Sequence, residues 1–218
     1  MLEVGRLLRA EGRYAARGGS VPVRSLAAIL VLAGFLHGAV MGSYGGKLLQ
    51  PLFSGLKVPL FVVVSTLVCL PNFFVLNTLL GLRDDFAAAV RGVFAAQATL
   101  GVALAGMAPL VLVFYLSVDD YRTAVVGNGL VFALATLAGQ VTLDRHYAAL
   151  VARDARHRIG RFAWLALYVF VAIQAAWVLR PFVGRPGLPS QFLRDDPWSN
   201  AYVVVARYVW AAWRHALG

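Results

Sequence analysis

The sequence contains five apolar stretches, each close to the length that crosses a lipid bilayer. The hydrocarbon core is about 30 Å thick and an α-helix rises about 1.5 Å per residue, so a crossing takes about 20 residues. The spans are expected at residues 25–44, 58–82, 92–118, 124–143 and 162–183. Because backbone groups in lipid must be hydrogen-bonded internally, these stretches predict helices. The expected fold class is an all-α integral membrane bundle of about five transmembrane helices.

The composition supports a membrane protein and argues against a nucleic-acid-binding one. Hydrophobic residues make up 60% of the chain and charged residues 14%, and the mean hydropathy is +0.73. The formal net charge of +10 comes from basic residues beside the apolar stretches. In that position they set topology and contact anionic lipid headgroups. The only cysteine, Cys69, excludes an intramolecular disulfide and a cysteine-based metal cluster within one chain.

Amphipathic segments are expected to flank the spans. Residues 1–20 predict a helix on the membrane surface, with an apolar face and four arginines, Arg6, Arg9, Arg13 and Arg17. Residues 21–183 form the transmembrane domain. Residues 184–218 comprise a Pro/Gly-rich loop and a second interfacial helix, with a sixth span as the alternative. In that helix Arg207, Trp210 and Trp213 are expected to contact lipid or a partner.

The distribution of basic residues predicts the orientation. With the amino terminus in the cytoplasm, twelve arginines fall on the cytoplasmic side before and between the five spans. Only Lys47, Lys57 and Arg122 fall in the external loops, whereas five arginines of the tail count against the scheme. The positive-inside rule therefore favours a cytoplasmic amino terminus. An abundance of arginine over lysine indicates a GC-rich bacterial genome, and hence the inner membrane.

Polar side chains within the spans are the candidate functional positions, because a polar group in lipid must face the bundle or a wet cavity. The amides are Asn72, Asn77, Gln97, Asn128, Gln140 and Gln174. Pro71 predicts a kink in the second span, which could line a substrate site or serve packing alone. Amides of this kind commonly hydrogen-bond across helices.

His37 is the one histidine near the middle of a span. It could ligate a metal, haem or chlorophyll, but an imidazole hydrogen-bonded to another helix is favoured, because no second ligand stands at a recognisable spacing. We therefore expect no cofactor. Three pairs of small residues predict close helix contacts. They are Gly38-xxx-Gly42, Gly101-xxx-Ala105 and Ala135-xxx-Gly139.

The remaining charged features have structural explanations. The carboxylates of Asp84 and Asp85 are expected to cap a helix amino terminus, and the pairs at residues 119–120 and 195–196 to cap or to lie in loops. Arg180, at the end of the fifth span, is expected to anchor the membrane boundary, or alternatively to clamp a lipid phosphate. No motif for hydrolysis or phosphoryl transfer is present, so the chain is expected not to be an enzyme.

The stretch from Gln174 through Arg180-Pro181-Phe182-Val-Gly184, followed by Phe192-Leu-Arg194 and Asn200-Ala-Tyr202, is the most distinctive in the chain. It resembles a group of bacterial multi-pass proteins with an "LRPF-G … FR … N-Y" signature. More distantly, five spans with a cytoplasmic amino terminus look like the Yip1 superfamily of membrane-organising proteins. The first resemblance implies the fold but carries no activity, and the second implies a membrane-organising role.

Two functions are expected from these observations. The first is a non-enzymatic scaffold, an accessory subunit of a membrane complex or a bilayer-organising protein. Its partners would be anionic lipids and other membrane proteins, or further copies of the chain. The alternative is a small transporter or channel subunit with a polar cavity near Pro71, Asn72 and Asn77.

Overall fold

The computed structural model describes residues 2–8, 23–193 and 200–203 of the chain. Its helices are α1 (Leu2–Leu8), α2 (Val23–Gly42), α3 (Leu49–Leu79), the 3₁₀ turn η2 (Arg83–Asp85), α4 (Phe86–Leu116), α5 (Tyr121–Arg153) and α6 (His157–Leu179). Helices α2 to α6 are long and apolar enough to cross a membrane. The predicted all-α architecture with five spans is therefore confirmed, and the helices fit a multi-pass membrane protein.

Each of the five long helices begins before the apolar stretch that predicted it, and all but α5 end before that stretch does. α3 begins at Leu49 rather than Val58, and Pro51 lies in its first turn, where a missing N–H costs no helical hydrogen bond. The prediction that Lys57 lies in an external loop is wrong, because Lys57 is a fully buried residue of α3. Hydropathy placed the start of the span at Val58, directly after Lys57, because this lysine finds its polar partners only in the tertiary structure.

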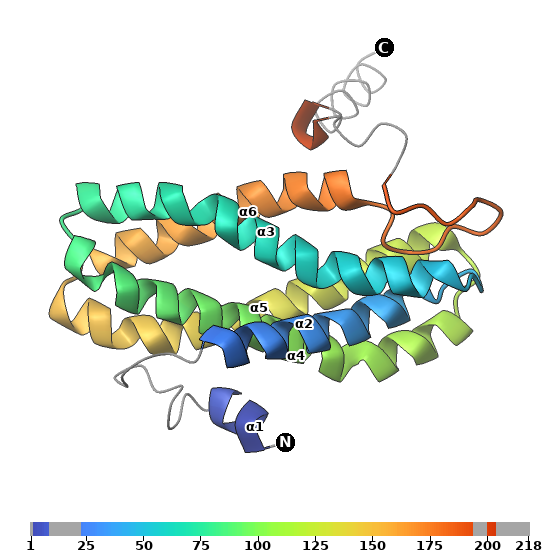
Figure 1. Cartoon of the computed structure of the whole chain (residues 1–218), viewed down its shortest axis with the longest axis horizontal. Coiled ribbons are helices and arrows are strands. Elements are labelled where there is room, and N and C mark those ends of the chain that lie inside the picture. The colour runs from blue at the N-terminus through green and yellow to red at the C-terminus, as the bar shows by residue number, and fades with distance from the viewer. Residues whose placement is uncertain (1, 9–22, 194–199, 204–218) are drawn as a thin grey trace, which may run out of the picture.

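The five long helices lie side by side along the length of the molecule (Figure 1). α2 packs against both α3 and α4, α5 packs against α4, and α6 packs mainly against α3. We call the end where α2, α4 and α6 finish and α3 and α5 start the loop end. The opposite end, where α3 passes to α4 and α5 to α6, is the arginine-rich end. The arginines at this end include Arg24, Arg83, Arg91, Arg145, Arg153, Arg156, Arg158 and Arg161.

Small residues bring neighbouring helices close together, as the small-residue pairs predicted. A Cβ atom added to Gly38 would lie 2.8 Å from the carbonyl carbon of Ser54, and one added to Gly42 would lie 2.8 Å from the Cα of Pro51. A Cβ atom added to Gly139 would lie 3.0 Å from the Ala96 carbonyl oxygen of α4. Real Cβ atoms do not approach backbone this closely, so glycine is required for the observed spacing of α2 and α3.

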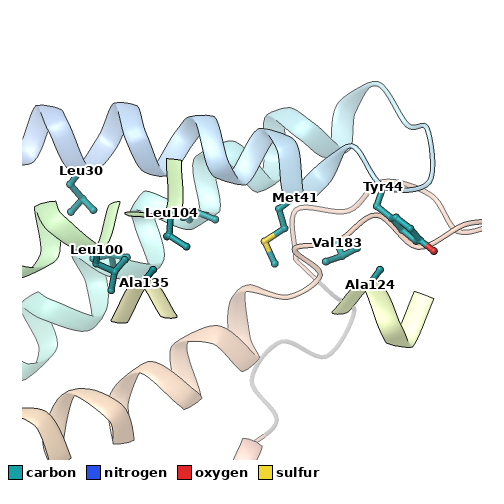
Figure 2. Close-up of a cluster of buried hydrophobic side chains, with 10 residues drawn as sticks. Leu30, Met41, Tyr44, Leu100, Leu104, Ala124, Ala135 and Val183 are labelled. Carbon is teal, nitrogen blue, oxygen red and sulfur yellow. The ribbon is translucent and has the colours of Figure 1, made fainter. Parts of the chain in front are cut away.

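Two apolar clusters fill the interior at different heights. The cluster at the loop-end half combines side chains of α2, α3, α4 and α5 with Val183, which follows α6 (Figure 2). The cluster towards the arginine-rich end centres on Phe73, Trp164 and Tyr168, with further residues of α4 and α5. Thus α2 contributes to the first cluster and α6 to the second, while α3, α4 and α5 contribute to both.

The terminal segments are described only in part. α1 contributes Leu7, which is fully buried against Leu26, Ala95 and Ala98. Most of the amphipathic segment expected over residues 1–20 lies outside the described residues. So do the interfacial positions Arg207, Trp210 and Trp213, together with the acidic pair at 195–196.

Candidate functional site

Three polar side chains of α3 bind the backbone of the segment that follows α6. Lys57 Nζ donates hydrogen bonds to the carbonyl oxygens of Pro181, at 2.6 Å, and Gln191, at 3.2 Å. Gln50 Nε2 donates to the same Pro181 oxygen at 3.2 Å, and the Ser54 hydroxyl donates to the Phe182 oxygen. We call Gln50, Ser54 and Lys57 the α3 polar row, and residues 181–191 the returning loop.

The α3 polar row is buried, although it lies within a membrane-spanning helix. Gln50 is 2% exposed, and Ser54 and Lys57 are 0% exposed. The lysine nitrogen also lies 5.2 Å from the ring centroid of Phe192 and 6.0 Å from that of Phe182. Carbonyl oxygens and aromatic faces both favour a positive group, so they offset the cost of removing the amine from water. The row therefore fixes the returning loop to α3.

The sequence held one signal for this row. Residues 50, 54 and 57 have helical spacing, and so project from one face of a helix. Their acceptors are backbone carbonyls that lie more than 120 residues away in the chain. No pattern of side chains identifies such acceptors, so the row could not be assigned a role from sequence.

Arg180 and Gln174 lie near the end of α6 and contact Trp177 and Ala201, respectively. Arg180 directly follows Leu179, the last residue of α6, and its guanidinium carbon lies 3.0 Å from the ring centroid of Trp177. Gln174 Oε1 accepts a hydrogen bond from the backbone N–H of Ala201 at 2.9 Å. Both residues thus have intramolecular contacts at the loop end.

The residues predicted to line a polar cavity in the second span do not share one face. Pro71 and Asn72 are exposed on α3. Asn77 is fully buried, donates to the Phe73 carbonyl oxygen at 2.8 Å, and faces Gly160 of α6. Asn77 therefore faces the packed interior, whereas Pro71 and Asn72 lie on the exposed side of α3.

The other amides lie apart from one another. Asn128 is buried near the loop end, where its amide donates to the Tyr115 hydroxyl at 2.6 Å and to the Ala124 carbonyl oxygen at 2.7 Å. Gln97 accepts from the Tyr168 hydroxyl at 3.3 Å, near the cluster towards the opposite end. Gln140 is partly buried on α5. Asn128 thus links α5 to α4, and Gln97 links α4 to α6, at separate heights.

His37 lies in a packed interior position. Its Nδ1 lies 2.8 Å from the Leu104 carbonyl oxygen and donates to it, and its ring meets the edge of Phe132. The ring is fully buried, and Nε2 has no partner in the described part of the chain. Among the described residues, no group of three His, Cys, Asp or Glu could hold a metal ion. The geometry is that of an interhelical hydrogen bond.

Asp85 connects three helices at the arginine-rich end. Its carboxylate pairs with Arg153, the last residue of α5, at 3.1 Å and with His157, the first residue of α6, also at 3.1 Å. His157 is fully buried. The prediction that Asp85 caps α4 through its side chain is wrong, because these two tertiary partners occupy the carboxylate and no side-chain cap is formed.

Side-chain capping does occur at the start of α5, and Asp154 stabilises the turn between α5 and α6. Asp120 caps α5, and hydrogen bonds from the Thr123 side chain and backbone lower the pKa of its carboxyl group. Asp154, between α5 and α6, accepts hydrogen bonds from the side chain and backbone of Arg156. Those bonds lower the pKa of Asp154 to about 2. Arg156 also donates to the Leu80 carbonyl oxygen at 2.8 Å, which links this turn to the end of α3.

Comparison of the chain with family models, curated proteins and solved structures gives no match. The resemblances to the multi-pass group with the "LRPF-G" signature and to the Yip1 superfamily therefore stay predictions. What is established is the architecture: helices that fit a multi-pass membrane protein, with a loop bound to a buried polar row.

Proposed function

We propose that the protein is a non-enzymatic membrane scaffold or accessory subunit, which packs against other membrane proteins or copies of itself. The observation that carries the proposal is the way the intramembrane polar groups are used. Lys57, His37 and Asn128 are each buried and bonded to another part of the chain. Buried polar side chains that are hydrogen-bonded within the chain hold its segments together, and they are not available to bind a solute.

The cavities support the same proposal. Cavities lined by described residues lie at both ends of the bundle, one beside Tyr44 and Tyr115 and one beside Arg91 and His146. Neither is lined by Asn72, Asn77 or Asn128. A transporter site is expected near the bilayer midplane, so the transporter alternative gains no support.

The least buried span is the natural contact for a partner. Of the five spans, α6 has the smallest buried share in its most apolar part. Phe162, Val169 and Ile173 are among its exposed side chains. We propose that a partner helix lies along this face. The arginine-rich end is proposed to face the cytoplasm of a bacterial inner membrane, in keeping with the positive-inside rule.

Photo-crosslinking in the native membrane tests this function. A photoreactive phenylalanine analogue is placed at Phe162 or Ile173, on the exposed face of α6, and at Tyr168, which is buried in the same helix, as the matched control. Discrete protein adducts from the exposed positions alone, also recovered by mild-detergent co-purification, would support a scaffold. Recovery of the chain with lipid adducts only, together with solute flux in liposomes, would contradict it.

A further inference from the structure

A cavity of about 510 Å³ opens between α4 and α5 at the arginine-rich end. Arg91, His146 and Arg153 supply its polar and charged lining, and none of its lining residues is acidic. Ala88, Ala149 and Ala152 supply much of the rest. Their short side chains leave the space open beside the basic groups.

Of the two arginines that line this cavity, only Arg153 is paired with a carboxylate of a described residue. Arg153 is paired with the carboxylate of Asp85 at 3.1 Å. Arg91 is partly buried, and within the described part of the chain it makes no hydrogen bond or ion pair. A half-buried guanidinium carries five N–H donors in a planar fork that fits the oxygens of a phosphate group. Arg91 thus leaves donors available to an anion.

His146 adds a further polar group to the cavity. It is 8% exposed, and its Nδ1 lies 2.9 Å from the Thr142 carbonyl oxygen. Donation from Nδ1 fixes the ring and leaves Nε2 as its second polar atom. Gly92 allows this arrangement, since a Cβ atom there would lie 3.0 Å from the Cβ of His146.

The depth of the cavity corresponds to the boundary between headgroups and hydrocarbon. α4 has 31 residues, so it is about 46 Å long and exceeds the hydrocarbon core by about 8 Å at each end when centred. Arg91 lies five residues after Phe86, the first residue of α4, which is about 7.5 Å along the axis. The backbone of Arg91 therefore lies near the edge of the hydrocarbon core, from which its long side chain can reach the lipid phosphates.

We propose that this cavity binds the phosphate of an anionic phospholipid, with Arg91 as the principal donor and the alanine-lined wall accommodating the glycerol and the first acyl carbons. The site needs the chain to lie in a bilayer, but it does not depend on the scaffold function. A lipid bound there would join α4 to α5 at the end where Asp85 joins them to α6.

Native mass spectrometry of the full chain in a neutral detergent tests the site, with phosphatidylglycerol and phosphatidylcholine as probes. Arg91→Gln is expected to weaken phosphatidylglycerol binding by about tenfold or more, because charge-assisted hydrogen bonds to the phosphate are lost. Arg83→Gln removes an exposed arginine from the same end without touching the cavity, and it is expected to leave the affinity unchanged.

A second variant distinguishes loss of the lipid site from unfolding of the protein. Ala152→Phe keeps every charge and fills the cavity from an exposed position, so it is expected to reduce binding as Arg91→Gln does. Equal binding of the two lipids, or equal losses for Arg91→Gln and Arg83→Gln, would overturn the proposal. Displacement of phosphatidylglycerol by millimolar inorganic phosphate would assign the site to a soluble anion and overturn the lipid assignment. Retention of the lipid in that competition supports it.

Discussion

Replacing Gly38 by alanine tests the close approach of α2 and α3. The added methyl group would lie 2.8 Å from the carbonyl carbon of Ser54 and 2.9 Å from the Cα of Gly55. Both are backbone atoms in the interior of α3, so neither can rotate away. The two helices must move apart, which loosens contacts along the interface that also carries Ser54 and Lys57.

The size of the effect follows from a comparison with a glycine that has free space. Overpacking of a close interface costs about 1–3 kcal/mol, whereas alanine in place of glycine favours a helix by about 0.5–1 kcal/mol. A Cβ atom at Gly106 would meet nothing within 4 Å. Gly106→Ala therefore gains the helix propensity of alanine without an overpacking cost. The free energies of unfolding of the two variants should differ by the overpacking cost, about 2 kcal/mol. That is about 4–8 °C in Tm for a chain of this size.

The single thiol of the protein can report its thermal unfolding. Cys69 is the only cysteine and is fully buried, so a thiol-reactive fluorogenic dye labels it only as the bundle opens. The midpoint of labelling on heating in detergent is compared for wild type, Gly38→Ala and Gly106→Ala. A midpoint for Gly38→Ala equal to or above that of Gly106→Ala would refute the close approach of α2 and α3.

Three further outcomes are expected. Lys57→Met leaves the Gln191 carbonyl oxygen without its donor and the Pro181 oxygen with Gln50 alone, so the protein should lose about 1–3 kcal/mol in the same assay. The loop should also be cleaved sooner by protease. Asp85→Asn weakens the contacts of this side chain with Arg153 of α5 and His157 of α6, and should cost about 1–3 kcal/mol. The folded-state pKa of Asp154 is lowered to about 2 by hydrogen bonds from Arg156. Its stabilising contribution is therefore present above the unfolded pKa of about 4, and is lost as pH falls from 4 towards 2.

Matched variants serve as controls for these outcomes. Lys47→Met removes the neighbouring lysine, which lies in the connection before α3, and should leave the loop protected. Asp84→Asn changes the exposed partner of the acidic pair and should shift stability by less than about 0.5 kcal/mol. For the pH dependence, the Tm difference between wild type and Asp154→Asn should shrink as pH falls from 4 to 2. A constant difference would contradict the assigned pKa.

The sequence was informative wherever a property repeats along the chain. Apolar length located all five spans, and small residues at i and i+4 located the contact of Gly38 and Gly42 with α3. It was uninformative wherever the partner of a side chain is set by the tertiary fold. Asp85 and Asp120 look alike in sequence, yet Asp120 caps its own helix while Asp85 turns to Arg153 and His157. Lys57 was misplaced for the same reason.

The returning loop has a consequence for how the protein is made. Lys57 and the Pro181 carbonyl oxygen that it binds are 124 residues apart in the chain. At about 5–20 residues per second, α3 would wait about 6–25 seconds for its acceptors to be synthesised. During that interval α3 is already available for membrane insertion, but Lys57 still lacks the carbonyl groups and aromatic rings that surround it in the finished fold. Membrane integration of α3 and completion of α6 are therefore coupled, and a nascent chain truncated before Pro181 should be a substrate for quality control.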